Sequence, residues 1–194
     1  MPERPFDNPN EVKARFDAFR YRDTSQRSFS CPIRPPYHLQ GMCYCDAPLH
    51  RAMWFYIRVA ITGWLLRLPF NGPKIWALRK WGAKIGRNVD LSVDVWIDPL
   101  FPDLLEIEDD VTIGTGARIA LHYVTPSEFH AGRVIIRRGA VIGGFSLIGS
   151  GVEIGEYATV AGGAVVGRDV PPRATAIGNP ARIIRASESM AEAS

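Results

Sequence analysis

The chain lacks the features that mark secreted scaffolds and nucleic-acid-binding proteins. Its 194 residues include only three cysteines, an odd number crowded into the first quarter, which excludes a disulfide-stapled secreted domain. The net charge of +3, from 23 basic and 20 acidic residues, is too small to indicate a nucleic-acid partner. The N-terminus shows no apolar segment with a cleavage site, so we expect no signal peptide and a cytoplasmic protein.

A long uninterrupted apolar run is also missing. The strongest candidate is residues 52–70, AMWFYIRVAITGWLLRLPF, but Arg58 and Arg67 interrupt it. Two arginines within nineteen residues argue against a transmembrane span, because a charged side chain is costly inside the bilayer.

Charge is unevenly distributed along the chain. Residues 88–110 contain eight acids and no Lys or Arg, whereas residues 132–185 contain seven arginines against three acids. The first stretch is therefore −8 and the second +4, and we expect an electrically lopsided fold.

The dominant pattern is a six-residue repeat that begins at Ile85. The second position is often Gly, and the fifth is nearly always small or β-branched. An aliphatic residue leads each of twelve hexads: Ile85, Leu91, Ile97, Ile107, Ile113, Ile119, Ile136, Ile142, Ile148, Ile154, Val160 and Val166. A six-residue period is neither helical nor simple strand alternation, and it predicts short strands linked by repeated turns.

Three hexads would make one triangular coil. The leading aliphatic residue would point into the prism and stack on the residue 18 positions later, and the small fifth residue would let the chain turn the corner. Twelve hexads give about four coils, which is enough for a stable repeat fold.

The repeated hexads and the closing segment DVPPRATAIGNPARIIR, residues 169–185, carry a resemblance. Over residues 80–185 the chain resembles the hexapeptide-repeat acyltransferases, which implies a mainly β fold, the left-handed parallel β-helix. ALRKWGAKIG, residues 77–86, and the stretch after it resemble the polysaccharide and sugar O-acetyltransferases of that family. We therefore expect three regions: a helical and irregular cap over residues 1–80, the β-helix over 81–185 and a disordered tail over 186–194.

Two insertions interrupt the hexads, about four residues near 99–103 and about eleven between Ile119 and Ile136. Loops on a rigid solenoid commonly carry function. Acyl transfer requires a general base near neutral pH, and histidine suits that role. The resemblance implies that His122, where the longer loop departs, is the catalytic base. Glu128 or a backbone carbonyl is expected to orient its ring, and Glu128 and His130 are expected near the acceptor, although His130 would also serve to brace the loop.

The resemblance implies acetyl-CoA as the acyl donor and no metal. Gly144 and Gly162, 18 residues apart, match positions that line the pantetheine arm, while Gly167, Arg168 and Arg182 match positions near the nucleotide end. The basic part of the chain would meet the phosphates. The resemblance also implies a homotrimer with each site at a subunit boundary.

The first eighty residues fit no template. Irregular structure is expected before Pro48, with one helix near residues 10–20, followed by one or two helices over 48–80 that cap the first coil. The alternative is an amphipathic helix over residues 52–70 in peripheral contact with a membrane. His38, Cys43, Cys45 and His50 fit no usual zinc spacing.

The sequence thus predicts a CoA-dependent O-acyltransferase, most simply an acetyltransferase, acting on a hydroxyl of a sugar or other small polar acceptor. N-acetylation of an amine is an alternative that needs the same base and donor. A γ-carbonic-anhydrase-like enzyme would need three converging histidines, and only two lie in the coil region. A non-catalytic β-helix is the remaining alternative.

Overall fold

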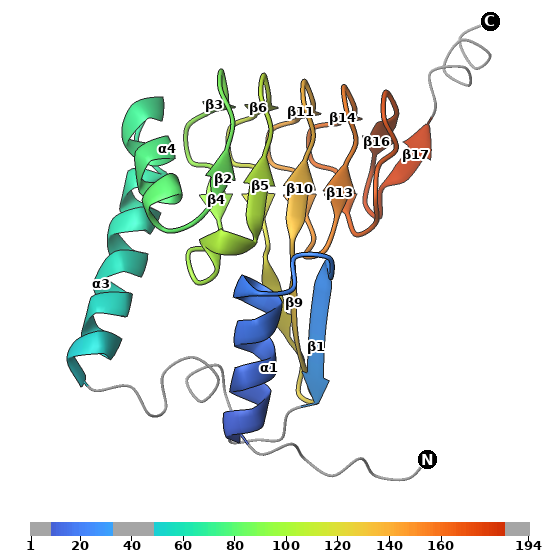
Figure 1. The fold of residues 1–194 in the computed structure, drawn as a ribbon. Helices are drawn as coiled ribbons and strands as arrows, with labels where there is room; N and C mark the ends of the chain where they lie inside the picture. Colours follow the sequence, from blue (N-terminus) through green and yellow to red (C-terminus); the bar gives the residue numbers. More distant parts are fainter. Residues whose placement is uncertain (1–8, 33–48, 185–194) are drawn as a thin grey trace, which may run out of the picture.

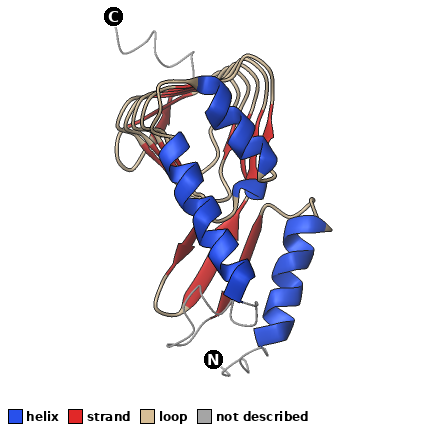
Figure 2. Cartoon of the chain, turned by 90° about the vertical axis from the view of Figure 1, so that its left-hand side faces the viewer, coloured by secondary structure: helices blue, strands red, loops and turns tan. Residues whose placement is uncertain are grey.

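The computed structural model describes residues 9–32 and 49–184. Parallel strands form the three faces of a prism (Figures 1 and 2). The first face holds β2 (Lys84–Ile85), β5 (Leu105–Ile107), β10 (Val134–Ile136) and β13 (Glu153–Ile154). The second holds β3 (Asp90–Leu91), β6 (Thr112–Ile113), β11 (Val141–Ile142), β14 (Thr159–Val160) and β16 (Thr175–Ile177), and β17 (Arg182–Ile184) is added antiparallel to β16. The third holds β4 (Trp96–Ile97), β7 (Arg118–Ile119), β12 (Leu147–Ile148) and β15 (Val165–Val166).

The register confirms the predicted stacking of the leading aliphatic residues. Ile136 pairs with Ile154 and Ile142 with Val160, each 18 positions apart. Across the short insertion the step is 22, as in Ile85 to Ile107, and across the long insertion it is 29, as in Ile107 to Ile136. These side chains fill the buried core of four coils, and the closing segment begins a fifth through β16.

The chain turns each corner at the fourth residue of the hexad. This corrects the prediction that the small fifth residue makes the turn. Asn88, Asp94, Asp110 and Phe145 occupy the fourth position with φ between 54° and 63°. This left-handed conformation suits Gly, Asn and Asp. The fifth residues are small for a different reason, because they are buried inside each corner.

Helix α4 (Asn71–Lys80) covers the open edge of the first coil. Lys74 donates hydrogen bonds from Nζ to the carbonyls of Leu91 and Ser92. Asn71 accepts from the Leu91 N–H at 2.9 Å, and Arg79 donates to the Ile85 carbonyl at 2.8 Å. Side chains of α4 thus supply partners that a further coil would otherwise supply. Helix α3 (Leu49–Leu65) lies against α4 at the same end of the prism (Figure 2).

The eleven-residue insertion forms an antiparallel hairpin of β8 (His122–Val124) and β9 (Glu128–Gly132) that projects below the prism (Figure 1). Strand β1 (Ser28–Pro32) pairs with β9, and helix α1 (Pro9–Tyr21) packs beside it, so part of the predicted N-terminal cap belongs to the hairpin's sheet. Phe16 of α1 lies against Phe101 and Phe129 at 5.3 and 5.4 Å between ring centroids.

A 3₁₀ turn, η1 (Pro102–Leu104), closes the shorter insertion. Arg20 of α1 binds both carboxylate oxygens of Asp103 beside this turn, at 2.8 and 2.7 Å. None of the helices in the described ranges, 9–32 and 49–184, is long and apolar enough to cross a membrane. The predicted tail at 186–194 lies outside the described residues.

Candidate active site

His122 is the first residue of β8, where the chain leaves the third face and enters the hairpin. Its Nδ1 is hydrogen-bonded to Oδ2 of Asp98, which follows β4 on the preceding coil. The other Asp98 oxygen, Oδ1, accepts from the backbone N–H of Leu100 at 3.0 Å. The Asp98 side chain is 1% exposed, and that of His122 is 14% exposed.

This geometry fixes the chemistry of the imidazole. A carboxylate accepts hydrogen bonds, so in the neutral imidazole Nδ1 carries the proton and Nε2 has the lone pair. Asp98 therefore takes the orienting role that the sequence suggested for Glu128 or a backbone carbonyl, and that expectation was wrong. A histidine held in this way by a buried carboxylate has the arrangement found in catalytic dyads and triads.

Aromatic rings hold the imidazole from two sides. Phe101 meets His122 edge-on, with ring centroids 5.3 Å apart and an interplanar angle of 86°. Phe129 of β9 lies 6.1 Å away at 27°. Both phenylalanines are buried, so they restrict the ring's orientation and exclude water from the Asp98 side.

Glu128 and His130 lie on the opposite face of the hairpin from His122. Strand register pairs Tyr123 with His130 and Val124 with Phe129, and alternate residues face opposite sides. His130 is hydrogen-bonded through Nδ1 to the Ser30 hydroxyl at 2.8 Å, and Tyr123 stacks on it. Burial lowers the pKa of His130, while Glu128 raises it to a smaller extent. His130 thus braces the hairpin. Within one chain, Glu128 and His130 do not share a site with His122, contrary to expectation.

Gly144 and Gly162 lie beside each other on successive coils, as predicted. The N–H of Gly163 donates to the Gly144 carbonyl at 2.9 Å, and a side chain on Gly162 would approach that same oxygen. They occupy the corner between the second and third faces, whereas His122 leaves from the corner between the third and first faces. One chain therefore does not bring the two glycines to His122.

Gly167, Arg168 and Arg182 do come together. They line one hollow of about 580 Å³ between β15 and the closing segment, together with Gly178 and Pro180. Both arginines are exposed. Other arginines of the basic stretch are already bound by protein groups: Arg137 by Glu108 and Glu153, and Arg133 by carbonyls of Phe19 and Arg20.

No group of three or more His, Cys, Asp and Glu side chains that could hold a metal occurs in the described part of the chain. Of the residues considered for zinc, His38, Cys43 and Cys45 lie outside the described ranges. The third cysteine, Cys31, is buried in β1.

Comparison with known proteins identifies the family. The sequence profile of the bacterial transferase hexapeptide (six repeats) family matches residues 133–168. The chain is 35% identical over 125 residues to YvoF of Bacillus subtilis (strain 168), which is named a putative acetyltransferase. The alignment covers 64% of this chain and 73% of YvoF. This chain belongs to the hexapeptide-repeat acetyltransferase family. The predicted family and fold are confirmed.

Two further similarities concern proteins with sugar substrates in their names. The dTDP-3-amino-3,6-dideoxy-α-D-galactopyranose 3-N-acetyltransferase of Aneurinibacillus thermoaerophilus is 58% identical over 52 residues, 27% of each chain. A solved galactoside acetyltransferase in complex with coenzyme A superposes with a TM-score of 0.52 at 18% identity, covering 72% of this chain and 84% of that one. At that identity the superposition supports the fold of this family member.

Sequence reasoning missed Asp98, although a signal was present. Asp98 occupies the second position of its hexad, where several hexads carry Gly, and it directly precedes the first insertion. The signal was an ionisable residue at a position that stacks on the next coil. It lies one coil before the residue at which the second insertion begins.

Proposed function

We propose that the protein transfers an acetyl group from acetyl-CoA to a hydroxyl of a sugar or similar small polar acceptor, with His122 as the general base. The observation that carries this proposal is the His122–Asp98 pair. A partly exposed histidine whose Nδ1 is held by a buried carboxylate is suited to accept a proton at Nε2.

The chemistry assigned to the dyad is proton transfer. Nε2 of His122 accepts the proton of the acceptor hydroxyl as its oxygen bonds to the acetyl carbon. Asp98 stabilises the imidazolium that forms, because its carboxylate is desolvated and already positioned. The carbon–sulfur bond then breaks, the departing thiolate takes the proton, and His122 returns to its neutral state.

The hollow between β15 and the closing segment fits the anionic end of the donor. Arg168 and Arg182 present two exposed guanidinium groups across it, and such groups pair well with phosphates. Gly144 and Gly162 form a stretch without side chains on the same third-face side, where a narrow thiol arm would find room. We assign Gly144, Gly162, Gly167, Arg168 and Arg182 to donor binding on this basis.

A homotrimer would bring His122 of one copy to Gly144 and Gly162 of another. His122 lies on one corner of the third face and the glycines lie on the other, so a site that uses both needs two copies of the chain. Cyclic three-fold symmetry places one corner of each copy against the other corner of its neighbour.

N-acetylation of an amino sugar is the second candidate. It is favoured by the 58% identity to an amino-sugar N-acetyltransferase over 52 residues. The same base and donor would serve, and the acceptor alone would differ.

A thiol-release assay with acetyl-CoA tests the proposal over a panel of sugars, amino sugars and other hydroxylated compounds. We expect turnover with a sugar that falls by roughly 10²-fold or more in His122→Ala. Unchanged turnover in that variant would move the base elsewhere. Absence of turnover, together with no coenzyme A binding by calorimetry, would contradict acyl transfer.

A further inference from the structure

Helix α3 turns two polar residues, Arg58 and Thr62, toward the protein. Arg58 donates to the Leu100 carbonyl at 3.2 Å, and its guanidinium lies over the rings of Phe55 and Trp81 at 4.9 and 5.4 Å. Thr62, one turn later, is buried and donates to the Arg58 carbonyl. A surface helix of a soluble protein normally turns such residues outward.

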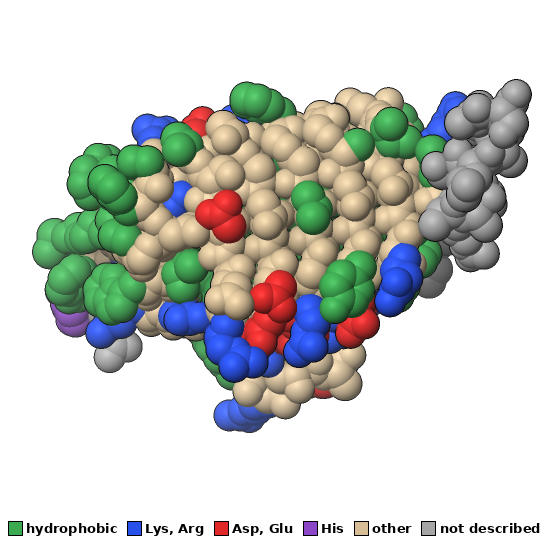
Figure 3. All heavy atoms as spheres, turned by 90° about the horizontal axis from the view of Figure 1, so that it is seen from above, with side chains coloured by type: hydrophobic (Ala, Val, Ile, Leu, Met, Phe, Trp, Pro, Cys, Tyr) green, Lys and Arg blue, Asp and Glu red, His purple; other side chains and the backbone are tan. Residues whose placement is uncertain are grey.

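The outward face of α3 is apolar and aromatic. Trp54, Ile57, Ile61 and Trp64 recur at helical spacing on one side of the helix, and the two tryptophans are 67% and 63% exposed. Met53 and Tyr56 widen this face, and Phe70 and Trp76 extend it toward α4. Figure 3 shows the resulting apolar cluster at the end of the molecule formed by α3 and α4. We call Met53, Trp54, Tyr56, Ile57, Ile61 and Trp64 the α3 outer face.

The helical segment that carries the α3 outer face contains charges of one sign. Residues 49–80 contain six Lys and Arg and no Asp or Glu. Arg58 and Lys74 are turned inward, whereas Arg67, Arg79 and Lys80 are exposed. Asp94 of the first coil lies 4.0 Å from Arg67, measured from Oδ1 to Nε, and both side chains are exposed. Asp109 binds Arg87 at 2.9 Å and Glu106 binds Lys84 at 3.2 Å.

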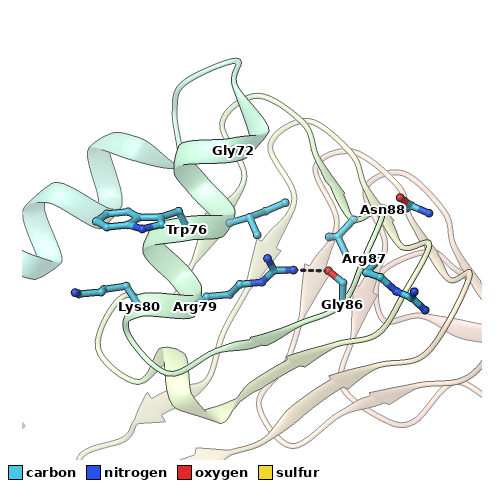
Figure 4. Close-up of a pocket in the computed structure, with 9 residues that line it drawn as sticks. Gly72, Trp76, Arg79, Lys80, Gly86, Arg87 and Asn88 are labelled. Carbon is cyan, nitrogen blue, oxygen red and sulfur yellow. Dashed lines mark hydrogen bonds between the residues drawn. The ribbon is translucent and has the colours of Figure 1, made fainter.

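A hollow of about 800 Å³ adjoins the same end of the molecule, between α4 and the first coil. Trp76 and Lys80 line its α4 side and Arg87 its coil side, as Figure 4 shows. Figure 4 shows the Trp76 and Lys80 side chains directed away from the coil, while Arg79 reaches across to Gly86. An exposed tryptophan therefore stands next to an exposed lysine beside a cavity that Arg79 and Arg87 also line. This combination matches the headgroup layer of a membrane, where aromatic rings and phosphate-binding cations lie at similar depth.

We propose that the α3 outer face docks the protein on an anionic phospholipid bilayer, with α3 lying in the plane of the interface. Its Trp and Ile side chains would enter the acyl boundary, and Arg67 and Lys80 would contact lipid phosphates. A second copy of this chain is a poorer occupant, because it would bring the same cations against one another without a compensating acid on either helix.

Docking would act close to the dyad. Arg58 of α3 binds the carbonyl of Leu100, and the N–H of Leu100 holds Asp98. Two hydrogen bonds through Leu100 thus connect α3 to the carboxylate that is hydrogen-bonded to His122. The bilayer contact itself does not depend on acyl transfer, so its test is separate from that of the proposed function.

Vesicle flotation of the full chain tests the proposal. We expect binding to vesicles of equal parts phosphatidylglycerol and phosphatidylcholine, weaker binding to phosphatidylcholine alone, and a blue shift of tryptophan fluorescence on binding. The double variant Trp54→Ser with Trp64→Ser should bind at least about ten-fold more weakly, because it loses two interfacial anchors. Trp96→Ser, an exposed tryptophan on the third face, is the matched control and should bind like the wild type.

A second set of variants tests the contribution of the basic side chains to vesicle binding. Arg67→Gln with Lys80→Gln should weaken binding to anionic vesicles by about ten-fold or more, since each cation near an anionic surface contributes roughly a five-fold factor. Arg118→Gln, exposed on the third face, is the control. Added salt should reduce wild-type binding and should affect the double charge variant less.

Two results would overturn the proposal. One is failure of the wild type to bind anionic vesicles at low salt, and the other is wild-type binding by the Trp54 and Trp64 double variant. If light scattering shows that this variant loses a self-association that the wild type has, and the wild type does not bind vesicles, the face joins copies of the chain. Thiol release with a soluble acceptor, measured on the same samples, separates loss of docking from loss of catalysis.

Discussion

The carboxylate of Asp98 is buried, and each of its oxygens already accepts a hydrogen bond, one from His122 and one from the Leu100 backbone. Such a group has no freedom to rotate away, so the imidazole it binds is fixed in both tautomer and direction. The rings of Phe101 and Phe129 restrict the same imidazole from outside. At the scale of single residues, the site is organised before any substrate arrives.

His130 gives a pH-dependent prediction at the same scale. Burial lowers its pKa below the ordinary 6.5, so below that pH the unfolded chain binds more protons than the folded one. The contribution of His130 to stability should be complete above pH 6.5 and should be lost as pH falls through the range between 6.5 and the lowered value. Urea unfolding at pH 8 and pH 5 should show this decrease in the wild type.

The control is His130→Gln, which keeps a hydrogen-bonding group near Ser30 but does not titrate. The difference in unfolding free energy between wild type and this variant should change between the two pH values. A difference that stays constant with pH would contradict the role assigned to His130.

At the scale of elements, α4 stabilises the open edge of the coils through Lys74. This side chain is fully buried and donates to two backbone carbonyls of the first coil, and burial lowers its pKa, with a smaller opposing effect of Asp90. Lys74→Met would leave both carbonyls without that donor and should lower the unfolding free energy by about 2–4 kcal/mol.

Lys80→Met, on the exposed side of the same helix, should change the unfolding free energy by less than about 0.5 kcal/mol. Equal effects of the two substitutions in urea unfolding would show that the Lys74 contacts do not stabilise the edge.

Phe16 links α1 to the hairpin. It is buried against Phe29, Phe101 and Phe129, and the last two also touch His122. Phe16→Ala should cost about 3–5 kcal/mol of unfolding free energy and should lower kcat, because the rings that hold the imidazole lose their support. Phe70→Ala, at an exposed position, should change neither stability nor kcat; a Phe16→Ala enzyme with wild-type kcat would contradict the link.

The hexads predicted the three faces and the core positions inside the prism, because an aliphatic residue at every sixth position is compatible with few other folds. They did not predict the core residues that α1, β1, α4 and the two insertions contribute, such as Phe16, Leu78 and Phe129. Helix boundaries near α1, α3 and α4 were also close to the expected ranges. The pairing of β1 with β9 was not predictable, because it joins segments about a hundred residues apart with no repeat between them. The role of Asp98 was not predicted for a similar reason. Its partner His122 lies 24 residues away, and the sequence does not specify the path of the insertion between them.

At the scale of the whole molecule, opposite charges that are separate in the sequence meet across coils. Arg137 on the third coil binds Glu108 on the second and Glu153 on the fourth, and Arg27 binds Glu153 and Asp169. The predicted lopsidedness is therefore partly neutralised along the first face. The hollow with Arg168 and Arg182 keeps its positive charge.

The proposed trimer gives a prediction at this scale. Light scattering should give a solution mass of three times the chain mass of 21.5 kDa. If the site needs two copies, mixing His122→Ala chains with Gly144→Trp chains should restore activity that neither variant has alone, because mixed trimers contain one intact boundary. A monomer with full activity would contradict the shared site.

The most direct test of the central claim is the kcat of Asp98→Asn against that of Asp94→Asn in the thiol-release assay. Asp94 occupies an exposed corner in the same coil, where Asn is equally compatible with φ near 57°. Asp98→Asn should lower kcat by roughly 10²-fold or more, because the amide cannot stabilise the imidazolium. Asp94→Asn should leave kcat unchanged. Equal activity of the two variants would show that the buried dyad is not the catalytic base.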